Sequence, residues 1–247
     1  MMKRFLTALE FLTIIRVPGD RGVGDEDLGG SMALFPLVGL LIGLILAGGR
    51  YVLGIALPSS LADILVIALL VIVTGCLHLD GFADTIDGLA GGGDREKTLA
   101  IMKDSRIGSF AVVGLILILI LKVAALMGVP EEIKSRALIA APVLGRWSTV
   151  QLAAWFDYAR AGYGTGRAFT RGAGRRGAVI STLIAAVIVA GTFGIRGLVM
   201  LLVIAVLTAL FGLFFKRRIG GVTGDIMGAA CEVSETALLI LVCALFV

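Results

Sequence analysis

The chain has 247 residues, of which 58% are hydrophobic and 16% charged, and its mean hydropathy is +1.03. A soluble globular domain carries roughly 25% charged residues, so these values exclude an ordinary soluble domain and indicate burial in a lipid bilayer. The net charge of +4 suits anionic headgroups or phosphorylated substrates. The sequence contains no nucleic-acid-binding motif and does not indicate an oligomeric state.

The first segment predicts an amphipathic helix at the membrane surface. An acid interrupts its apolar stretch and no small-residue cleavage site follows, so it is not typical of a signal peptide. Four polar residues fall near one face of the expected interfacial helix: Lys3, Thr7, Glu10 and Thr13. Pro18 and the Gly/Asp-rich run 19–30 then predict a loop.

Seven stretches have the apolar character of membrane-spanning helices, which need about 20 residues each. They cover residues 33–53, 61–77, 109–128, 137–155, 178–193, 198–215 and 236–247, the last together with some residues before it. None shows the period-2 alternation of a transmembrane barrel. The stretches fill more than half of the chain, so we expect one all-α domain over residues 1–247, a polytopic helical membrane protein.

The distribution of basic residues predicts the orientation of the chain. Sixteen of the 22 Lys and Arg residues lie on one side, in segments 1–30, 78–107, 156–177 and 216–230. The positive-inside rule therefore places the N-terminus and these segments in the cytoplasm, as in a multi-pass protein of the cell membrane. Seven spans would leave the C-terminus outside.

Three aspartates mark the most informative segment, 78–88. Asp80, Asp84 and Asp87 stand at i, i+4 and i+7, so they share one face of a helix. Like charges on one face repel, and Mg²⁺ bound together with substrate phosphates would compensate them. The alternative is a solvated loop in which Asp caps helices and Gly makes turns, and Asp94 fits that interpretation as the N-cap of a short helix.

The sequence lacks the ligands of zinc, haem and iron–sulfur sites, because its three cysteines form no CxxC pair and His78 is the only histidine. Any metal must therefore be held by oxygen. His78 is a candidate general base or a partner for a carboxylate, although an ideal helix places it about 160° from Asp80.

Charged residues before the third stretch are candidates for binding phosphate. Lys103 and Arg106 can hold phosphate oxygens, and Asp104 between them could complete a metal site. A basic anchor at the membrane surface would explain the two cations equally well.

Two cations fall inside expected spans, where an unpaired charge is costly. Arg146 follows Gly145, which permits close approach, and is the better candidate for gripping a phosphate. Lys122 lies near the end of its stretch and could extend its ammonium group to the interface.

A final polar stretch, 220–228, leads into the last span. Its Gly-rich backbone next to a helix start can cradle an anion, although a flexible turn has the same composition. Asp225, Glu232 and Glu235 add three acids to a chain with few of them, which favours a functional role.

Taken together, these motifs resemble the cobalamin synthase family, the integral-membrane adenosylcobinamide-GDP ribazoletransferases. The resemblance runs along nearly the whole chain, and its residues are Phe11–Thr13, Phe35–Gly39, His78–Gly88, Ile101–Gly108, Gly145–Trp147 and Gly221–Asp225. The sequence departs from the family where Arg16 and Pro18 are spaced differently from Thr-Arg-x-Pro, so no role is carried over to Arg16.

The resemblance implies the joining of adenosylcobinamide-GDP and α-ribazole, or its 5′-phosphate, to give adenosylcobalamin, or its phosphate, and GMP, with Mg²⁺. Asp80, Asp84 and Asp87 would hold Mg²⁺ on the diphosphate. An aspartate or His78 would take the proton of the attacking hydroxyl. Five residues would contact substrate: Lys103, Asp104, Arg106, Arg146 and Asp225.

Two other functions compete with this one. A CDP-alcohol phosphotransferase shares the opening Asp84-x-x-Asp87-Gly88, but the rest of its aspartate motif does not follow. A transporter would carry acids within its spans, whereas the aspartates here lie at or near the expected cytoplasmic ends. The sequence leaves open the choice between α-ribazole and its phosphate, the number of Mg²⁺ ions and the identity of the base.

Overall fold

The computed structural model describes residues 1–19, 22–160 and 165–246, and these confirm an all-α protein. The elements are α1 (Met2–Leu12), α2 (Asp25–Ser31), the 3₁₀ helix η1 (Met32–Leu34), α3 (Phe35–Ala56), α4 (Ser59–Thr74), α5 (Leu77–Gly91), α6 (Arg95–Ile101), α7 (Ser109–Gly128), α8 (Glu131–Trp155), α9 (Thr165–Phe193), α10 (Ile195–Ile219) and α11 (Gly224–Phe246). Within the described residues, β pairing is limited to a bridge between Tyr158 and Val222.

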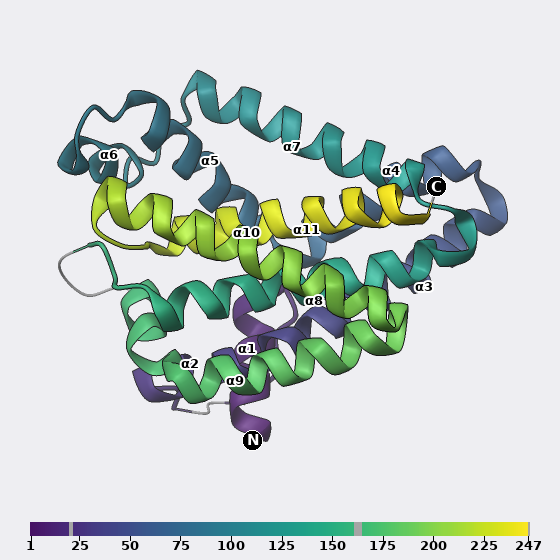
Figure 1. Ribbon diagram of the computed structural model, residues 1–247, viewed down its shortest axis with the longest axis horizontal. Helices are drawn as coiled ribbons and strands as arrows, with labels where there is room; N and C mark the ends of the chain where they lie inside the picture. The colour runs from purple at the N-terminus through teal and green to yellow at the C-terminus, as the bar shows by residue number, and fades with distance from the viewer. Residues whose placement is uncertain (20–21, 161–164, 247) are drawn as a thin grey trace.

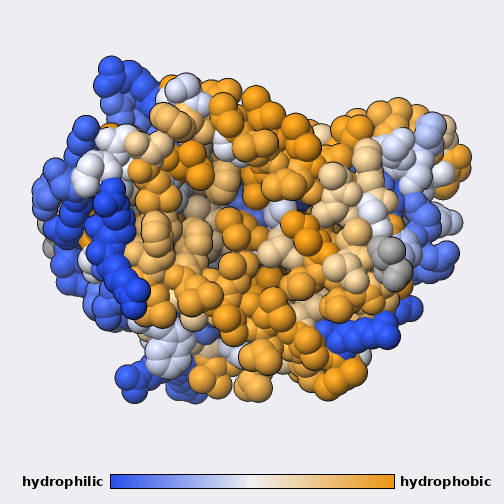
Figure 2. All heavy atoms as spheres, turned by 45° about the horizontal axis from the view of Figure 1, so that its top comes forward, coloured by the Kyte–Doolittle hydropathy of each residue, from blue (hydrophilic) through white to orange (hydrophobic). Residues whose placement is uncertain are grey.

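The long helices run side by side along the long axis of the molecule, and α1 lies across them (Figure 1). One end of the bundle carries α6, and the other carries the C-terminus and the connection from α3 to α4 (Figure 1). Figure 2 shows a broad apolar surface between two hydrophilic ends. This distribution fits a bundle whose middle lies in lipid and whose ends reach water.

Five helices are long and apolar enough to cross a membrane, or six if the bent pair α4 and α5 forms one span. The five are α3 with the residues that precede it, α7, α9, α10 and α11. The 25-residue helix α8 is not among them, and it carries polar residues such as Arg146 and Gln151 on a mostly buried surface. The expected number of seven spans therefore stays a prediction.

The chain bends by 90° between α4 and α5. Gly75 and Cys76 both adopt left-handed backbone conformations there, so the helix of the apolar stretch ends at Thr74. The backbone N–H of Ile14 donates to the Val73 carbonyl oxygen at 2.9 Å, which ties the segment after α1 to this bend. The bend turns α5, with its three aspartates, away from the direction of α4.

Two local expectations have different outcomes. Asp94 caps α6 as predicted, because its carboxylate accepts a hydrogen bond from the backbone N–H of Lys97 at 2.8 Å. The prediction of a loop over residues 19–30 is wrong in part, because Asp25–Ser31 form the helix α2. The backbone of α2 at Gly29 lies directly against Gly172 of α9, and this contact between distant segments favours the helix.

The terminal helix α1 is more buried than an interfacial helix requires. Thr7 and Thr13, two of the four residues of its expected polar face, are both only 4% exposed. Each hydroxyl donates to a backbone carbonyl of the preceding turn, Thr7 to Lys3 and Thr13 to Leu9. A position at the membrane surface stays a prediction, but α1 is also an integral part of the packed core.

Glycines allow α3 and α8 to pack at close range. A methyl group on Gly39 would lie 2.5 Å from the Pro142 carbonyl oxygen, and one on Gly43 would lie 2.6 Å from the Ile139 Cα. Both neighbours are backbone atoms of α8, which cannot move without shifting the helix. Small residues at such positions are the usual basis of helix packing in lipid.

Lys122 is fully enclosed, so the expectation that its side chain extends to the interface is wrong. Its ammonium group donates to Glu232 at 2.6 Å and to Glu235 at 2.7 Å, and only 2% of its side chain is exposed. Arg146 from α8 forms a further ion pair with Glu235. We call Lys122, Arg146, Glu232 and Glu235 the buried ion cluster.

Replacing Gly39 or Gly43 by alanine is expected to destabilise the bundle by about 1–3 kcal/mol, the usual cost of overpacking. Gly48→Ala in the same helix is the control, because a methyl group there would meet no atom within 4 Å. The measurement is the midpoint of thermal denaturation in detergent. Equal midpoints for all three variants would contradict the close approach of α3 and α8.

Lys122→Met is expected to lower the free energy of unfolding by roughly 3–5 kcal/mol, because it leaves a buried carboxylate of Glu232 without its cation. The double variant Lys122→Met/Glu232→Gln removes both charges and is expected to recover most of that loss. Thermal denaturation of the two proteins in detergent measures the difference. A double variant no more stable than the single one would argue against charge pairing as the cause.

Candidate active site

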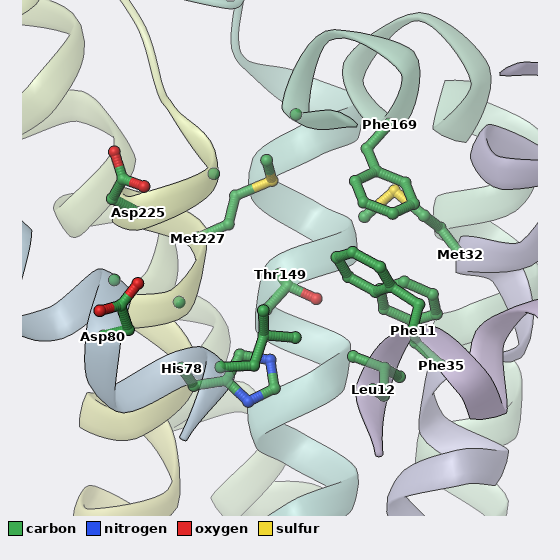
Figure 3. A pocket seen from close by; sticks show the side chains of 15 residues that line it. Phe11, Leu12, Met32, Phe35, His78, Asp80, Thr149, Phe169, Asp225 and Met227 are labelled. Atoms are coloured by element: carbon green, nitrogen blue, oxygen red, sulfur yellow. The ribbon is translucent and has the colours of Figure 1, made fainter. Parts of the chain in front are cut away.

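A pocket lies where α1, η1, α5, α8, α9 and the starts of α3 and α11 meet, and its cavity volume is about 170 Å³. We call it the aromatic–acidic pocket. Its lining residues include Phe11, Met32, Phe35, His78, Asp80, Thr149, Phe169, Asp225 and Met227. Figure 3 shows the two carboxylates on one side and the three phenyl rings on the other, with Thr149 between them. One cavity therefore offers two chemically different ends.

The acidic end forms because α5 and α11 approach through glycines. A methyl group on Gly81 would lie 2.8 Å from the Asp225 carbonyl oxygen, and one on Gly228 would lie 3.3 Å from that of His78. This close packing places Asp225 beside Asp80 (Figure 3). The structure thus brings together two expected site residues that are far apart in the sequence.

Asp84 lies in a field dominated by other acids. The charges of Asp225, Asp80 and Asp87 all act on its carboxyl group, and the only cation among its main electrostatic neighbours is Arg160. Arg160 donates to Asp225 at 2.7 Å and to the Met102 carbonyl oxygen at 3.2 Å. Sequence analysis assigned no individual role to Arg160, because its only signal was membership of a basic segment.

Asp87 has a structural role in addition to any role at a metal. Its two oxygens accept hydrogen bonds from the backbone N–H groups of Gly108 at 2.6 Å and Ala111 at 2.8 Å. N–H groups in the first turn of a helix have no partner within the helix, and a carboxylate can accept hydrogen bonds from them. Asp87 therefore fixes the start of α7 against α5, and its role as a metal ligand stays a prediction.

The acidic end has the chemistry of a magnesium site. Asp80, Asp84 and Asp225 offer the hard oxygen ligands that Mg²⁺ prefers. These three acids outnumber the one arginine, Arg160, among their electrostatic neighbours. Within the described part of the chain, no three Asp, Glu, His or Cys side chains form a ready-made metal cage. Mg²⁺ does not need one, because it is usually held by one or two carboxylates together with substrate phosphates and water.

His78 and Arg146 meet on the buried side of the pocket. The Arg146 Nη2 and the His78 Nδ1 lie 3.5 Å apart, and both residues are almost completely buried. Arg146 is held by Glu235 and is not among the lining residues of the pocket, whereas His78 is. The structure therefore places Arg146 behind His78, and the expected contact of Arg146 with a phosphate stays a prediction.

The expected phosphate-binding loop before α7 lies next to the site without lining the pocket. Hydrogen bonds hold both ends of this loop. At its start the Met102 carbonyl oxygen accepts from Arg160, and at its end the Gly108 N–H donates to Asp87. Lys103 is exposed, and Asp104 pairs with Arg106 at 2.6 Å. Hydrogen bonds from Arg106 lower the pKa of Asp104 to about 2, so Asp104 stays ionised and is unsuited to accept a proton.

A second, polar cavity of about 420 Å³ adjoins the ion pair of Arg160 and Asp225. We call it the arginine pocket. Its polar and aromatic lining residues are Trp155, Asp157, Tyr158, Arg160, Arg167, Thr170 and Arg171. Because Asp225 lines the first pocket and Arg160 the second, their ion pair connects the two cavities. Arginine side chains are suited to planar recognition of phosphate.

Comparison with known proteins agrees with the sequence motifs. Residues 4–243 match the family model described as cobalamin-5-phosphate synthase. A protein of Geotalea daltonii named adenosylcobinamide-GDP ribazoletransferase is 44% identical over 95% of this chain and 94% of its own length. A protein of the same name from Acetivibrio thermocellus is 39% identical over 97% of this chain and 97% of its own length. Another, from Pseudomonas savastanoi pv. phaseolicola, is 42% identical over 97% of this chain and 98% of its own length.

No solved structure matches the chain significantly. The family model and the relatives nevertheless extend over almost the whole sequence, and the residues matched by the family model include every segment that carried the resemblance inferred from the motifs. The chain therefore belongs to the cobalamin-5-phosphate synthase family.

Proposed function

We propose that the protein is a Mg²⁺-dependent transferase that joins adenosylcobinamide-GDP and α-ribazole, or α-ribazole 5′-phosphate, with release of GMP. The product is adenosylcobalamin, or its 5′-phosphate. Family membership supports the assembly of the cobalamin nucleotide loop. The observation that carries the chemistry is the convergence of Asp80, Asp84 and Asp225 beside Arg160. Asp80 and Asp225 line the aromatic–acidic pocket, and Arg160 lines the arginine pocket.

The reaction exchanges one phosphate ester for another. The ribose 3′-hydroxyl oxygen of α-ribazole forms a bond to the phosphorus attached to cobinamide, while the bond from that phosphorus to the bridging oxygen breaks and GMP leaves. Such a transfer depends on positioning and charge neutralisation more than on covalent chemistry by the protein. The hydroxyl proton passes to a carboxylate of the acidic end or to His78, the two kinds of base that line the pocket.

Asp80, Asp84 and Asp225 would hold Mg²⁺ on the diphosphate. The bound ion would neutralise the negative charge of the phosphate oxygens and orient them. Arg160 and the other arginines of the arginine pocket would bind the guanosine diphosphate portion. Lys103 and Arg106, in the neighbouring loop that Met102 ties to Arg160, would contact its phosphate oxygens. Asp87 would keep that loop in place through Gly108.

The alternative of a transporter fits the arrangement less well. Among the described residues, the buried acids Glu232 and Glu235 are already paired with Lys122 and Arg146. The buried Asp63 is likewise paired, with Arg50 and Lys134. Asp80, Asp84 and Asp225 cluster instead at the polar end of the molecule, where soluble nucleotide substrates would arrive. Movement of cobinamide across vesicles without release of GMP would favour the transporter.

Asp84→Asn is expected to lower GMP release by at least about a hundredfold, because it removes a carboxylate from the proposed metal site. The assay contains detergent-purified protein, adenosylcobinamide-GDP and α-ribazole, with and without Mg²⁺. Asp94→Asn is the matched control, because asparagine can also cap α6. Folded wild-type protein that releases no GMP would refute the transferase, and full activity of Asp84→Asn would refute the site.

The orientation of the chain is a further part of the proposal. We place the site in the cytoplasm and the C-terminus outside the cell membrane, because basic residues are concentrated in the segments that flank the site. Alkaline phosphatase fused after the last residue is expected to be active, and green fluorescent protein at the same position to be dark. The opposite pair of results would contradict the proposed topology, because a cytoplasmic C-terminus requires either a reversed orientation or an even number of spans.

A further inference from the structure

We infer that the aromatic end of the aromatic–acidic pocket is the binding site for the base of α-ribazole, and that Phe11, Phe35 and Phe169 select a flat aromatic acceptor. This inference rests on the proposed function and adds to it which substrate occupies which cavity. It also gives a role to α1, which carries no expected site residue.

Three phenyl rings from distant parts of the chain surround this end. The ring centroids of Phe11 and Phe169 are 4.7 Å apart in an edge-on arrangement, and those of Phe35 and Phe169 are 5.8 Å apart at 75°. Phe35 and Phe169 are almost completely buried, at 2% and 4% exposure. Rings held at such angles present both faces and edges to the cavity, and flat aromatic bases bind to such surfaces by stacking.

The polar end of the same cavity matches the rest of the nucleoside. A nucleoside has a flat apolar base at one end and ribose hydroxyl groups at the other, and carboxylates accept hydrogen bonds from hydroxyl groups. With its base among the phenyl rings, the ribose would face Asp80 and Asp225 (Figure 3). The attacking 3′-hydroxyl would then lie at the acidic end, where the diphosphate is proposed to bind.

The size of the cavity discriminates between the two substrates. Sites for drug-sized ligands usually have volumes of about 300–1,000 Å³, whereas this cavity has about 170 Å³. A corrin macrocycle is far larger than a nucleoside base and cannot enter a space of this size. The cavity therefore favours the flat base of α-ribazole, and the larger arginine pocket of about 420 Å³ remains for the nucleotide portion of the other substrate.

The test measures the two substrates separately by equilibrium dialysis with the full-length protein in detergent. Phe169→Ala is expected to raise the dissociation constant of α-ribazole by roughly 5- to 150-fold, the range that loss of base–aromatic stacking produces. The dissociation constant of adenosylcobinamide-GDP should not change. Phe169→Tyr keeps an aromatic face and is expected to retain most of the affinity for α-ribazole.

Phe193→Ala is the matched control, because Phe193 is in the same helix, is 8% exposed and also contacts another ring, that of Phe246. Phe169→Leu replaces Phe169→Ala if the smaller side chain prevents folding, which size-exclusion chromatography reveals. An unchanged α-ribazole affinity, an equal loss in Phe193→Ala, or a loss confined to adenosylcobinamide-GDP would each overturn the inference while wild-type protein still releases GMP. Absence of GMP release by the wild type would instead overturn the proposed function.

Discussion

The buried ion cluster is the constraint on which the positions of the other helices depend. Ionised side chains inside a membrane protein are stable only when they are paired. Glu232 and Glu235 lie one turn apart on α11, and their partners Lys122 and Arg146 come from α7 and α8. Because two cations face two carboxylates, a helix that slides by one turn leaves charges without partners. The cluster therefore fixes the register of three helices at once.

This register also positions the candidate active site. Arg146 reaches from the cluster to His78 at the start of α5, and α11 carries Asp225 two turns before Glu232. The close approach at Gly81 then sets the Asp225 carboxylate against the aspartates of α5. Catalytic groups need support from a rigid surrounding shell. Here the paired charges in the apolar middle would supply that support for the proposed site, whose aspartates lie at the polar end.

The sequence predicted the features that depend on nearby residues. The period of Asp80, Asp84 and Asp87 indicated a helix, and Asp94 indicated a cap, because both patterns lie within a few residues. The sequence could not predict that Lys122 pairs with Glu232 and Glu235, because these partners are 110 and 113 residues away. For the same reason the aromatic end of the pocket was missed, although the segments containing Phe11 and Phe35 were recognised as motifs. Long-range packing, and not local propensity, brings these residues together.

The charge balance of the acidic end explains why the proposed reaction pairs a metal with a diphosphate. Several aspartates there face one arginine, Arg160, which is already paired with Asp225. A diphosphate arriving alone would add negative charge to an acidic surface and would be repelled. A divalent cation offsets most of the charge of a diphosphate diester, so the two together can approach carboxylates that would reject the anion by itself. In the proposed reaction the aspartates would therefore favour the metal-bound form of the substrate, and the adjoining arginines would bind its phosphates next to the acidic end.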